Sequence, residues 1–157
     1  MPLKDLTYPN YNKPTLIQEE LLTIVDMHQK WLNREPKGYR ADFSYQDLTM
    51  CDLSNLNLTG ACFMKTNMSK VLAHKTNFSG ALLQGANLSG ADLSFSNLSQ
   101  ATFVGANLTN ANLFRVTLSG ATGNGKEIKS LSIGQYPCVY TSVLIQFACQ
   151  RHHIQKW

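Results

Sequence analysis

The middle of this chain repeats itself every five residues, and that period constrains the fold more than any other feature of the sequence. Sixteen consecutive units each have a central residue that is Leu, Phe or Met, except for one Ala. These centres are Phe43, Leu48, Leu53, Leu58, Phe63, Met68, Ala73, Phe78, Leu83, Leu88, Leu93, Leu98, Phe103, Leu108, Leu113 and Leu118. A small residue, most often Ala, lies two positions before the centre, and Asp or Asn usually lies directly before it. Ser or Thr usually follows the centre, and Gly is frequent after that.

Neither an α-helix nor a flat strand would bury such a pattern. Five residues turn an α-helix by about 500°, which spreads the centres over all its faces. In a strand, an odd spacing sends successive centres to opposite faces. The pattern instead predicts a chain that bends after each unit, because Asx, Ser and Gly favour turns. Bending in the same sense each time winds a solenoid with the centres inside.

A spacing of twenty residues gives the most consistent columns of equivalent positions. It aligns one large apolar column, Phe43, Phe63, Leu83 and Phe103, and one small column, Ala41, Ala61, Ala81, Ala101 and Ala121. A spacing of fifteen residues breaks up both sets. We therefore expect four units per coil and about four coils, which stack to roughly 19 Å at the ~4.8 Å distance between paired strands.

The stretches "ANLSGADLS" and "GANLTNANL" resemble the A(D/N)LXX repeat of the pentapeptide repeat family. This resemblance implies an all-β solenoid, specifically a right-handed quadrilateral β-helix with the centres and Ala residues inward. We assign it to residues 41–122, between an N-terminal segment, 1–40, and a C-terminal cap, 123–157, within one domain. The arrangement of the flanks is similar to that of small pentapeptide repeat proteins found in phages and prophages.

Both ends of a solenoid need covering. A helix is expected from about Thr15 to Asn33, with Thr15 and Gln18 as a capping box. One face of it is apolar and is expected to dock on the first coil, or alternatively to bind a partner: Ile17, Leu21, Ile24, Val25, His28, Trp31 and Leu32. After the repeats, the strand-like runs "EIKSLSI" and "YPCVYTSV" predict a β-rich cap. A homodimer through this C-terminal cap is left open.

Composition excludes several classes of function. The net charge is +4, but residues 41–122 hold four Lys/Arg and four Asp/Glu. The last segment, 123–157, holds four Lys/Arg and one Glu, which is too weakly basic to predict nucleic-acid binding. No apolar run is long enough to span a membrane, and the first fifteen residues do not resemble a secretion signal. The four cysteines lack disulfide-framework spacing, so we expect reduced thiols and a cytoplasmic location.

Residues that carry chemistry are few. Cys149, His152 and His153 lie together in "CQRHH", where two or three of them are candidate ligands of a soft metal. The more ordinary interpretation is a buried thiol beside surface histidines. We predict no enzyme, no catalytic residue, no metal and no cofactor, and keep a metal- or thiol-dependent activity of the tail as an alternative.

One side of the predicted solenoid departs from the Ser and Asn of the other sides. At a spacing of twenty residues, a set of apolar and basic side chains gathers there: Leu72, His74, Lys75, Phe95, Phe114 and Arg115. Two interpretations are open. Lys75 and Arg115 could stack on Phe95 within the molecule, since cations favour aromatic faces. Alternatively the set is a partner-binding surface, because exposed aromatics with Arg are frequent anchors of interfaces.

We therefore predict a non-enzymatic protein-binding or scaffold protein that uses a lateral face of a rigid β-helix. A phage-type modulator of a host protein is one such role, and a protein partner is expected rather than a nucleic acid or a membrane. The family resemblance suggests an alternative, a DNA-mimic inhibitor or protector of a topoisomerase or other nucleic-acid enzyme. That role needs an anionic surface, which the balanced charge of the repeats does not supply.

Overall fold

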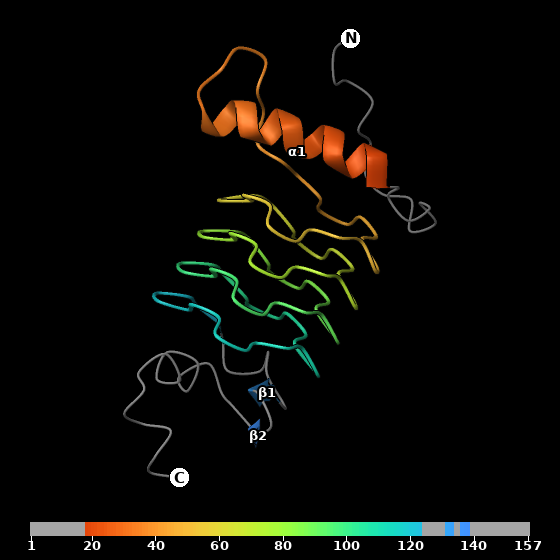
Figure 1. Ribbon diagram of the computed structural model, residues 1–157, viewed down its shortest axis with the longest axis vertical. Helices are drawn as coiled ribbons and strands as arrows, with labels where there is room; N and C mark the ends of the chain where they lie inside the picture. The colour runs from red at the N-terminus through yellow and green to blue at the C-terminus, as the bar shows by residue number, and fades with distance from the viewer. Residues whose placement is uncertain (1–17, 124–130, 134–135, 139–157) are drawn as a thin grey trace.

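A computed structural model describes residues 18–123, together with the backbone of residues 131–133 and 136–138. Its elements are helix α1 (Gln18–Leu32) and strands β1 (Leu131–Ile133) and β2 (Tyr136–Cys138). In Figure 1, α1 lies across one end of a stack of coils. Strands β1 and β2 pair antiparallel and fall within the two runs predicted to be extended. The rest of the predicted C-terminal cap lies outside the described residues.

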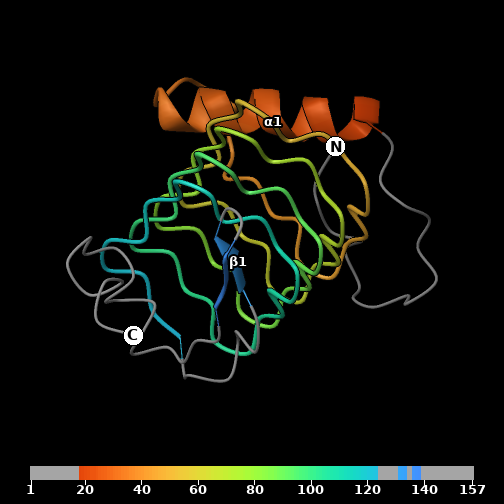
Figure 2. The ribbon, with the colours of Figure 1, turned by 60° about the horizontal axis from the view of Figure 1, so that its bottom comes forward.

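The coils stack so that one residue of each unit pairs with the residue twenty positions further along the chain. Asp42 pairs in parallel with Cys62, Cys62 with Leu82, and Leu82 with Thr102. Figure 2 shows the four-sided outline of these coils. Each side contributes a single bridging residue, because a turn every five residues leaves no room for a longer strand. The predicted β-helix is therefore a stack of parallel bridges rather than of continuous strands.

The corners are encoded locally. The side-chain oxygen of Asp42 accepts a hydrogen bond from the backbone N–H of Ser44, 2.9 Å away, and equivalent Asx residues repeat this contact along the solenoid. The carbonyl of Phe43 accepts from the N–H of Gln46 at 3.0 Å, which closes the turn. The residue between Ser44 and Gln46 has a positive φ, as the third residue of a type II turn requires.

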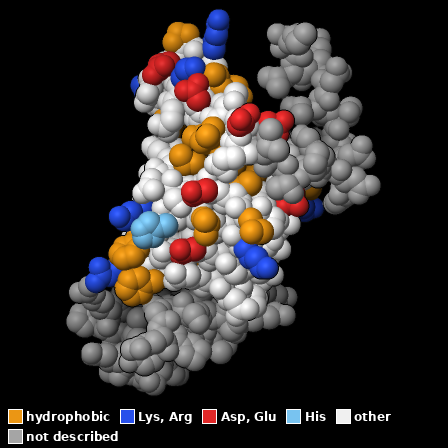
Figure 3. Space-filling view, turned by 45° about the vertical axis from the view of Figure 1, so that its right-hand side comes forward, with side chains coloured by type: hydrophobic (Ala, Val, Ile, Leu, Met, Phe, Trp, Pro, Cys, Tyr) orange, Lys and Arg blue, Asp and Glu red, His pale blue; other side chains and the backbone are white. Residues whose placement is uncertain are grey.

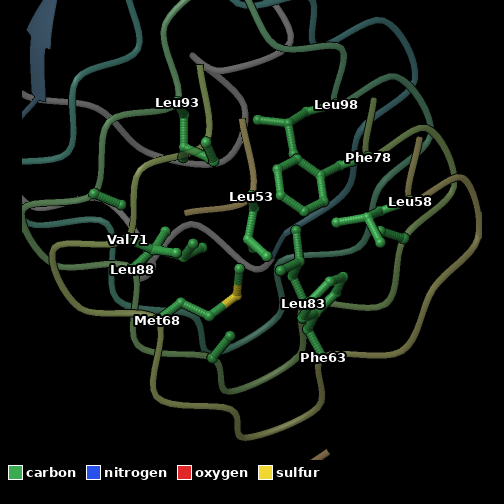
Figure 4. Close-up of a cluster of buried hydrophobic side chains, with 14 of the residues drawn as sticks. Leu53, Leu58, Phe63, Met68, Val71, Phe78, Leu83, Leu88, Leu93 and Leu98 are labelled. Carbon is green, nitrogen blue, oxygen red and sulfur yellow. The ribbon is translucent and has the colours of Figure 1, made fainter. Parts of the chain in front are cut away.

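The core runs along the axis and is filled by the repeat centres, all sixteen of which are buried. Figure 4 shows the side chains of several of them, including Phe63, Phe78 and Leu93, pointing into the interior. Ala73, the small exception, is compensated by Val71, which lies two positions earlier and is also fully buried. Each buried Leu or Phe contributes about 1.5–3 kcal/mol to stability.

Three inward positions that are usually Ala carry hydroxyl groups instead. Thr66 donates to the carbonyl of Phe43, and Thr76 donates to that of Leu53, both at 2.7 Å. Ser96 makes the same bond to Ala73. These hydroxyls add hydrogen bonds between successive coils, so burying them leaves no unsatisfied donor.

Helix α1 covers the N-terminal end of the core. Three of its own residues, Leu21, Val25 and His28, are buried, as predicted for its apolar face. Ile24 and Leu32 are partly buried, Trp31 stays 41% exposed, and Ile17 lies outside the described residues. The ring of Trp31 stacks on that of His28, with ring centroids 5.3 Å apart.

The helix also satisfies part of the open edge of the first coil. Gln18 Nε2 donates to the carbonyl of Asp52 at 3.0 Å, and Gln18 Oε1 accepts from the N–H of Asp52 at 3.3 Å. Gln29 Nε2 donates to the carbonyl of Asn57 at 3.2 Å. Gln18 pairs with the solenoid in this way because an edge carbonyl and N–H of the first coil have no preceding coil. Thr15 lies outside the described residues, so the expected capping box stays a prediction.

We expect Gln18→Ala combined with Gln29→Ala to weaken the docking of α1. Removing these hydrogen bonds to the edge should lower the free energy of unfolding by about 1–2 kcal/mol. Chemical denaturation, together with faster hydrogen exchange at the amide of Asp52, measures this effect. Glu20→Ala, at an exposed position of the same helix, is the matched control and should change neither quantity. Equal effects of the two variants would contradict a role of the glutamines in edge pairing.

Candidate protein-binding surface

The predicted partner-binding residues do come together on one side of the solenoid. We call the set Leu72, His74, Lys75, Phe95, Phe114 and Arg115 the Phe95 patch. Figure 3 shows hydrophobic, histidine and basic side chains adjoining on one face of the coils. Leu72 is 50% exposed, Phe95 41% and Phe114 38%. The patch therefore presents apolar and aromatic surface to the solvent beside positive charge.

Three residues of the patch occupy strained corners. Lys75, Phe95 and Arg115 have φ values of 56°, 61° and 55°, in the left-handed region that favours glycine. Six of the sixteen corners of the solenoid are glycine. A side chain in this conformation costs roughly 1–2 kcal/mol. A large, half-exposed aromatic ring at such a corner is therefore not what folding alone favours.

The two phenylalanine rings and the histidine ring contact one another edge to face. The centroids of Phe95 and Phe114 are 5.4 Å apart, and those of His74 and Phe95 are 5.2 Å apart. The guanidinium of Arg115 lies over both phenylalanine rings, 5.7 Å from the Phe95 centroid and 5.5 Å from that of Phe114. Four residues of the patch, His74, Phe95, Phe114 and Arg115, therefore form one connected cluster.

The predicted stacking of two cations on Phe95 is only half correct. Arg115 makes the contact, but Lys75 is not among the cations that stack on aromatic rings in the described part of the chain. Lys75 lies in the coil before that of Phe95, and its side chain is exposed. The opposite neighbour of Phe95 is instead the ring of His74.

A carboxylate that the sequence analysis did not single out lies within this surface. Burial raises the pKa of Asp92, but hydrogen bonds from Ser94 and Asn112 and the nearby charge of His74 outweigh it, so the pKa is lowered overall. Ser94 is also within 3.0 Å of the Nδ1 atom of His74. The signal was available, because the twenty-residue spacing stacks Asp92 directly on Leu72.

A second exposed apolar group lies on another side and was also missed. Tyr45, Met64 and Val104 are all more than a third exposed. The ammonium of Lys65 lies 5.5 Å from the centroid of the Tyr45 ring. The same spacing places these residues on one side of the coils. Its smaller aromatic content and single cation make it a useful comparison surface for the Phe95 patch.

Candidate metal and thiol chemistry is sparse in the described residues. Within them, no three His, Cys, Asp or Glu side chains are grouped closely enough to hold a metal ion. Cys51 and Cys62 are buried, and burial together with the charge of Asp47 raises the pKa of the Cys51 thiol. Cys149, His152 and His153 lie outside the described residues. No helix in residues 18–123 has the length and apolar character needed to cross a membrane.

Comparison with known proteins finds similar solved structures and one matching family profile. Solved structures similar to it include a pentapeptide repeat protein of the Arabidopsis thaliana thylakoid lumen, 25% identical, with a TM-score of 0.47 over 62% of this chain and 71% of that one. A pentapeptide repeat protein from Nostoc Pcc 7120 is 22% identical, with a TM-score of 0.48 over 66% and 94% of the two chains. QnrB1, a plasmid-mediated fluoroquinolone resistance protein, is 19% identical, with a TM-score of 0.33 over 60% and 51%.

No curated protein matches the chain. The profile of the family described as pentapeptide repeats matches residues 39–72, 76–114 and 91–122, in eight copies. These matches cover just over half of the 157 residues and coincide with the coils described above. The four-sided coils agree with the quadrilateral β-helix that the family resemblance implies. The chain belongs to the pentapeptide repeat family.

Proposed function

We propose that this chain is a non-enzymatic binding protein that captures a protein partner on the Phe95 patch. The observation that carries the proposal is Phe95 itself, a half-exposed aromatic residue at a corner with a φ of 61°. Its ring contacts with His74, Phe114 and Arg115 contribute about 0.5–1.5 kcal/mol each. They offset the strain of the corner but leave the rings partly in water. A partner that buries the exposed part of these rings would add the stabilisation that apolar burial gives.

The surroundings of the patch suit binding rather than catalysis. Two of the polar groups here already have partners, since His74 is bonded to Ser94 and the neighbouring Asp92 accepts from both Ser94 and Asn112. The coils beneath form a continuous packed core, so the patch moves little and loses little entropy on binding. Aromatic rings and Arg held in this way are typical interface anchors. A modulator of a host protein in a phage or bacterium is consistent with such a surface.

DNA mimicry is less favoured by the same surface. Residues 41–122 carry Asp42, Asp47, Asp52 and Asp92 against Lys65, Lys70, Lys75 and Arg115, so their formal charges cancel. A mimic of duplex DNA needs a continuous negative stripe instead. The tail alternative, a metal- or thiol-dependent activity, rests on residues outside the described part of the chain. Elemental analysis for zinc on the whole protein tests it.

The decisive variant is Phe95→Gly combined with Phe114→Ala. Glycine relieves the strained corner, so the free energy of unfolding should stay within about 1 kcal/mol of the wild type. Capture of a partner should be lost, and after its identification the Kd should rise at least 100-fold, because anchors of this kind are each worth about 2 kcal/mol or more. Affinity capture from the native cell, followed by calorimetry, measures both.

Met64→Ala combined with Val104→Ala is the matched control. These residues are exposed to a similar extent, 37% and 42%, on another side of the same coils. The control should retain the partner that the patch variant loses. If all three proteins retain the same partners, the Phe95 patch is not the binding surface. A loss of stability above about 2 kcal/mol in the patch variant would instead favour a purely structural role for the rings.

A further inference from the structure

We infer that the segment captured by the Phe95 patch is an acidic amphipathic helix, with one row that reads acid, apolar, acid along its axis. This inference rests on the proposed function and names the kind of partner that the surface fits. Three features of the patch carry it: its unpaired positive charge, its satisfied backbone and the spacing of its corner residues.

Among the described residues, the two cations of the patch have no carboxylate partner. Lys75 and Arg115 are exposed, and the ion pair found among the described residues is elsewhere, between Lys30 and Asp26. The nearby carboxylate of Asp92 is occupied by Ser94 and Asn112. Charge complementarity therefore favours an anionic partner. The chain's own segment 123–157 does not supply one, since it holds four Lys/Arg and one Glu.

A nucleic acid would also be anionic, but the surface offers little to it. Proteins that bind duplex DNA commonly neutralise about 6–10 phosphates. The patch has two cations, and residues 41–122 as a whole are electrically neutral. Exposed apolar area, including Leu72, also lies between and beside the charges. A protein segment with apolar side chains uses that area, whereas a phosphate backbone does not.

In the coils that carry Lys75 and Phe95, the backbone ladder on this side is already paired. The N–H of Ala73 donates to Asp92, and the N–H of Asp92 donates to Val71 of the coil before. The N–H groups of Lys75 and Phe95 donate to Ser94 and Phe114 of the next coils. Strand addition needs an open edge, so recognition here must come from the partner's side chains.

The spacing of the corners selects a helix over an extended segment. Lys75, Phe95 and Arg115 lie in three successive coils. The backbone positions of the two cations are therefore ~9.6 Å apart, with that of the phenylalanine midway. On an α-helix, residues i, i+4 and i+7 form a row that spans ~10.5 Å. Three successive same-side residues of an extended strand span ~13.6 Å. The helical row matches the corner column to within ~1 Å, which flexible Lys and Arg side chains can absorb.

Two synthetic peptides test this match. Both are alanine-based helices of about 20 residues with the same composition. The row peptide has Glu, Leu and Glu at i, i+4 and i+7, and the isomer has the same Leu on the opposite face. We expect the row peptide to bind the full-length protein at least about 10-fold more tightly than the isomer in calorimetry. The affinity should fall as salt is added, because the contact is partly ionic.

Variants of the protein then locate the contact. Lys75→Gln combined with Arg115→Gln should remove the preference for the row peptide. Lys65→Gln combined with Lys70→Gln removes the same amount of charge from other corners, and this variant should still prefer the row peptide. Equal binding of both peptides, no binding of the row peptide at 1 mM, or tighter binding of a 20-base-pair DNA duplex would overturn the inference. Those results leave the proposed function standing if Phe95→Gly with Phe114→Ala still abolishes partner capture. Capture that survives this variant ends the proposed function itself.

Discussion

Replacing Leu93 with aspartate is expected to unfold the coils around it. Leu93 is 1% exposed and lies in the core column between Ala73 and Leu113. The change removes about 1.5–3 kcal/mol of apolar burial and adds a carboxylate with no partner, which costs several kcal/mol more. The total approaches the whole stability of a domain of this size, about 5–15 kcal/mol. Far-UV circular dichroism during urea denaturation measures the effect.

Leu93→Met is the matched control for this prediction. It keeps the volume and the apolar character, so it should cost less than about 1.5 kcal/mol. A unit at the surface of an open sheet would tolerate the aspartate as readily as the methionine. Similar denaturation midpoints for the two variants would therefore contradict the buried position of the repeat centres.

Acidification from pH 7 to pH 5 is expected to destabilise the docking of α1 through His28. This side chain is fully buried, and its Nδ1 atom accepts a hydrogen bond from the N–H of Ala41 at 3.1 Å. Protonation would place a second donor against that N–H. Burial lowers the pKa of His28, and the charge of Arg40 lowers it further, although the backbone of Thr59 partly opposes them.

The sign follows from this lowered pKa. Below its ordinary value of 6.5, the unfolded state binds a proton that the folded state resists, so stability is lost as the pH falls. The pKa of Asp52 is also lowered, by hydrogen bonds from Ser54. Burial raises the pKa of Asp92, but hydrogen bonds from Ser94 outweigh this effect and lower it overall. Their contribution is lost only near and below their ordinary value of 3.8. The two windows are therefore separate.

Thermal unfolding followed between pH 5 and 8 measures the His28 contribution. The variant His28→Asn keeps an acceptor near the N–H of Ala41 but cannot titrate, so its melting temperature should depend less on pH in this range. Fluorescence of Trp31, which stacks on His28, reports the release of α1 locally. Parallel pH profiles for the wild type and His28→Asn would show that another group controls the acid response.

Much of the fold follows from the sequence because its information is local and repeated. Each five-residue unit, with its Asx, its centre and its corner residue, forms its own turn. Sixteen equivalent turns fix the twenty-residue coil. The column that builds the Phe95 patch needs only that register, so its members could be named in advance. At residues 71 and 73 the usual order of a small residue followed by a large centre is reversed. The sequence also predicts that both side chains are buried, since the two positions point inward.

Other details depend on contacts between distant parts of the chain. The side-chain amide of Gln18 bonds to Asp52, a contact that only the docking of α1 determines. Trp31 was expected to be covered, but 41% of its surface is exposed. Arg115 rather than Lys75 stacks on Phe95. Periodicity places such long side chains on a side but does not fix their rotamers.

The stacking of residues twenty positions apart is the claim on which the patch and both binding proposals depend. Nuclear Overhauser contacts between backbone protons of the labelled protein test it most directly. We expect contacts between Asn67 and Asn87, Leu72 and Asp92, and Asp92 and Asn112, each pair twenty residues apart. Contacts at fifteen residues, or a helical series at three and four residues within 41–122, would contradict this register and separate Phe95 from His74 and Arg115.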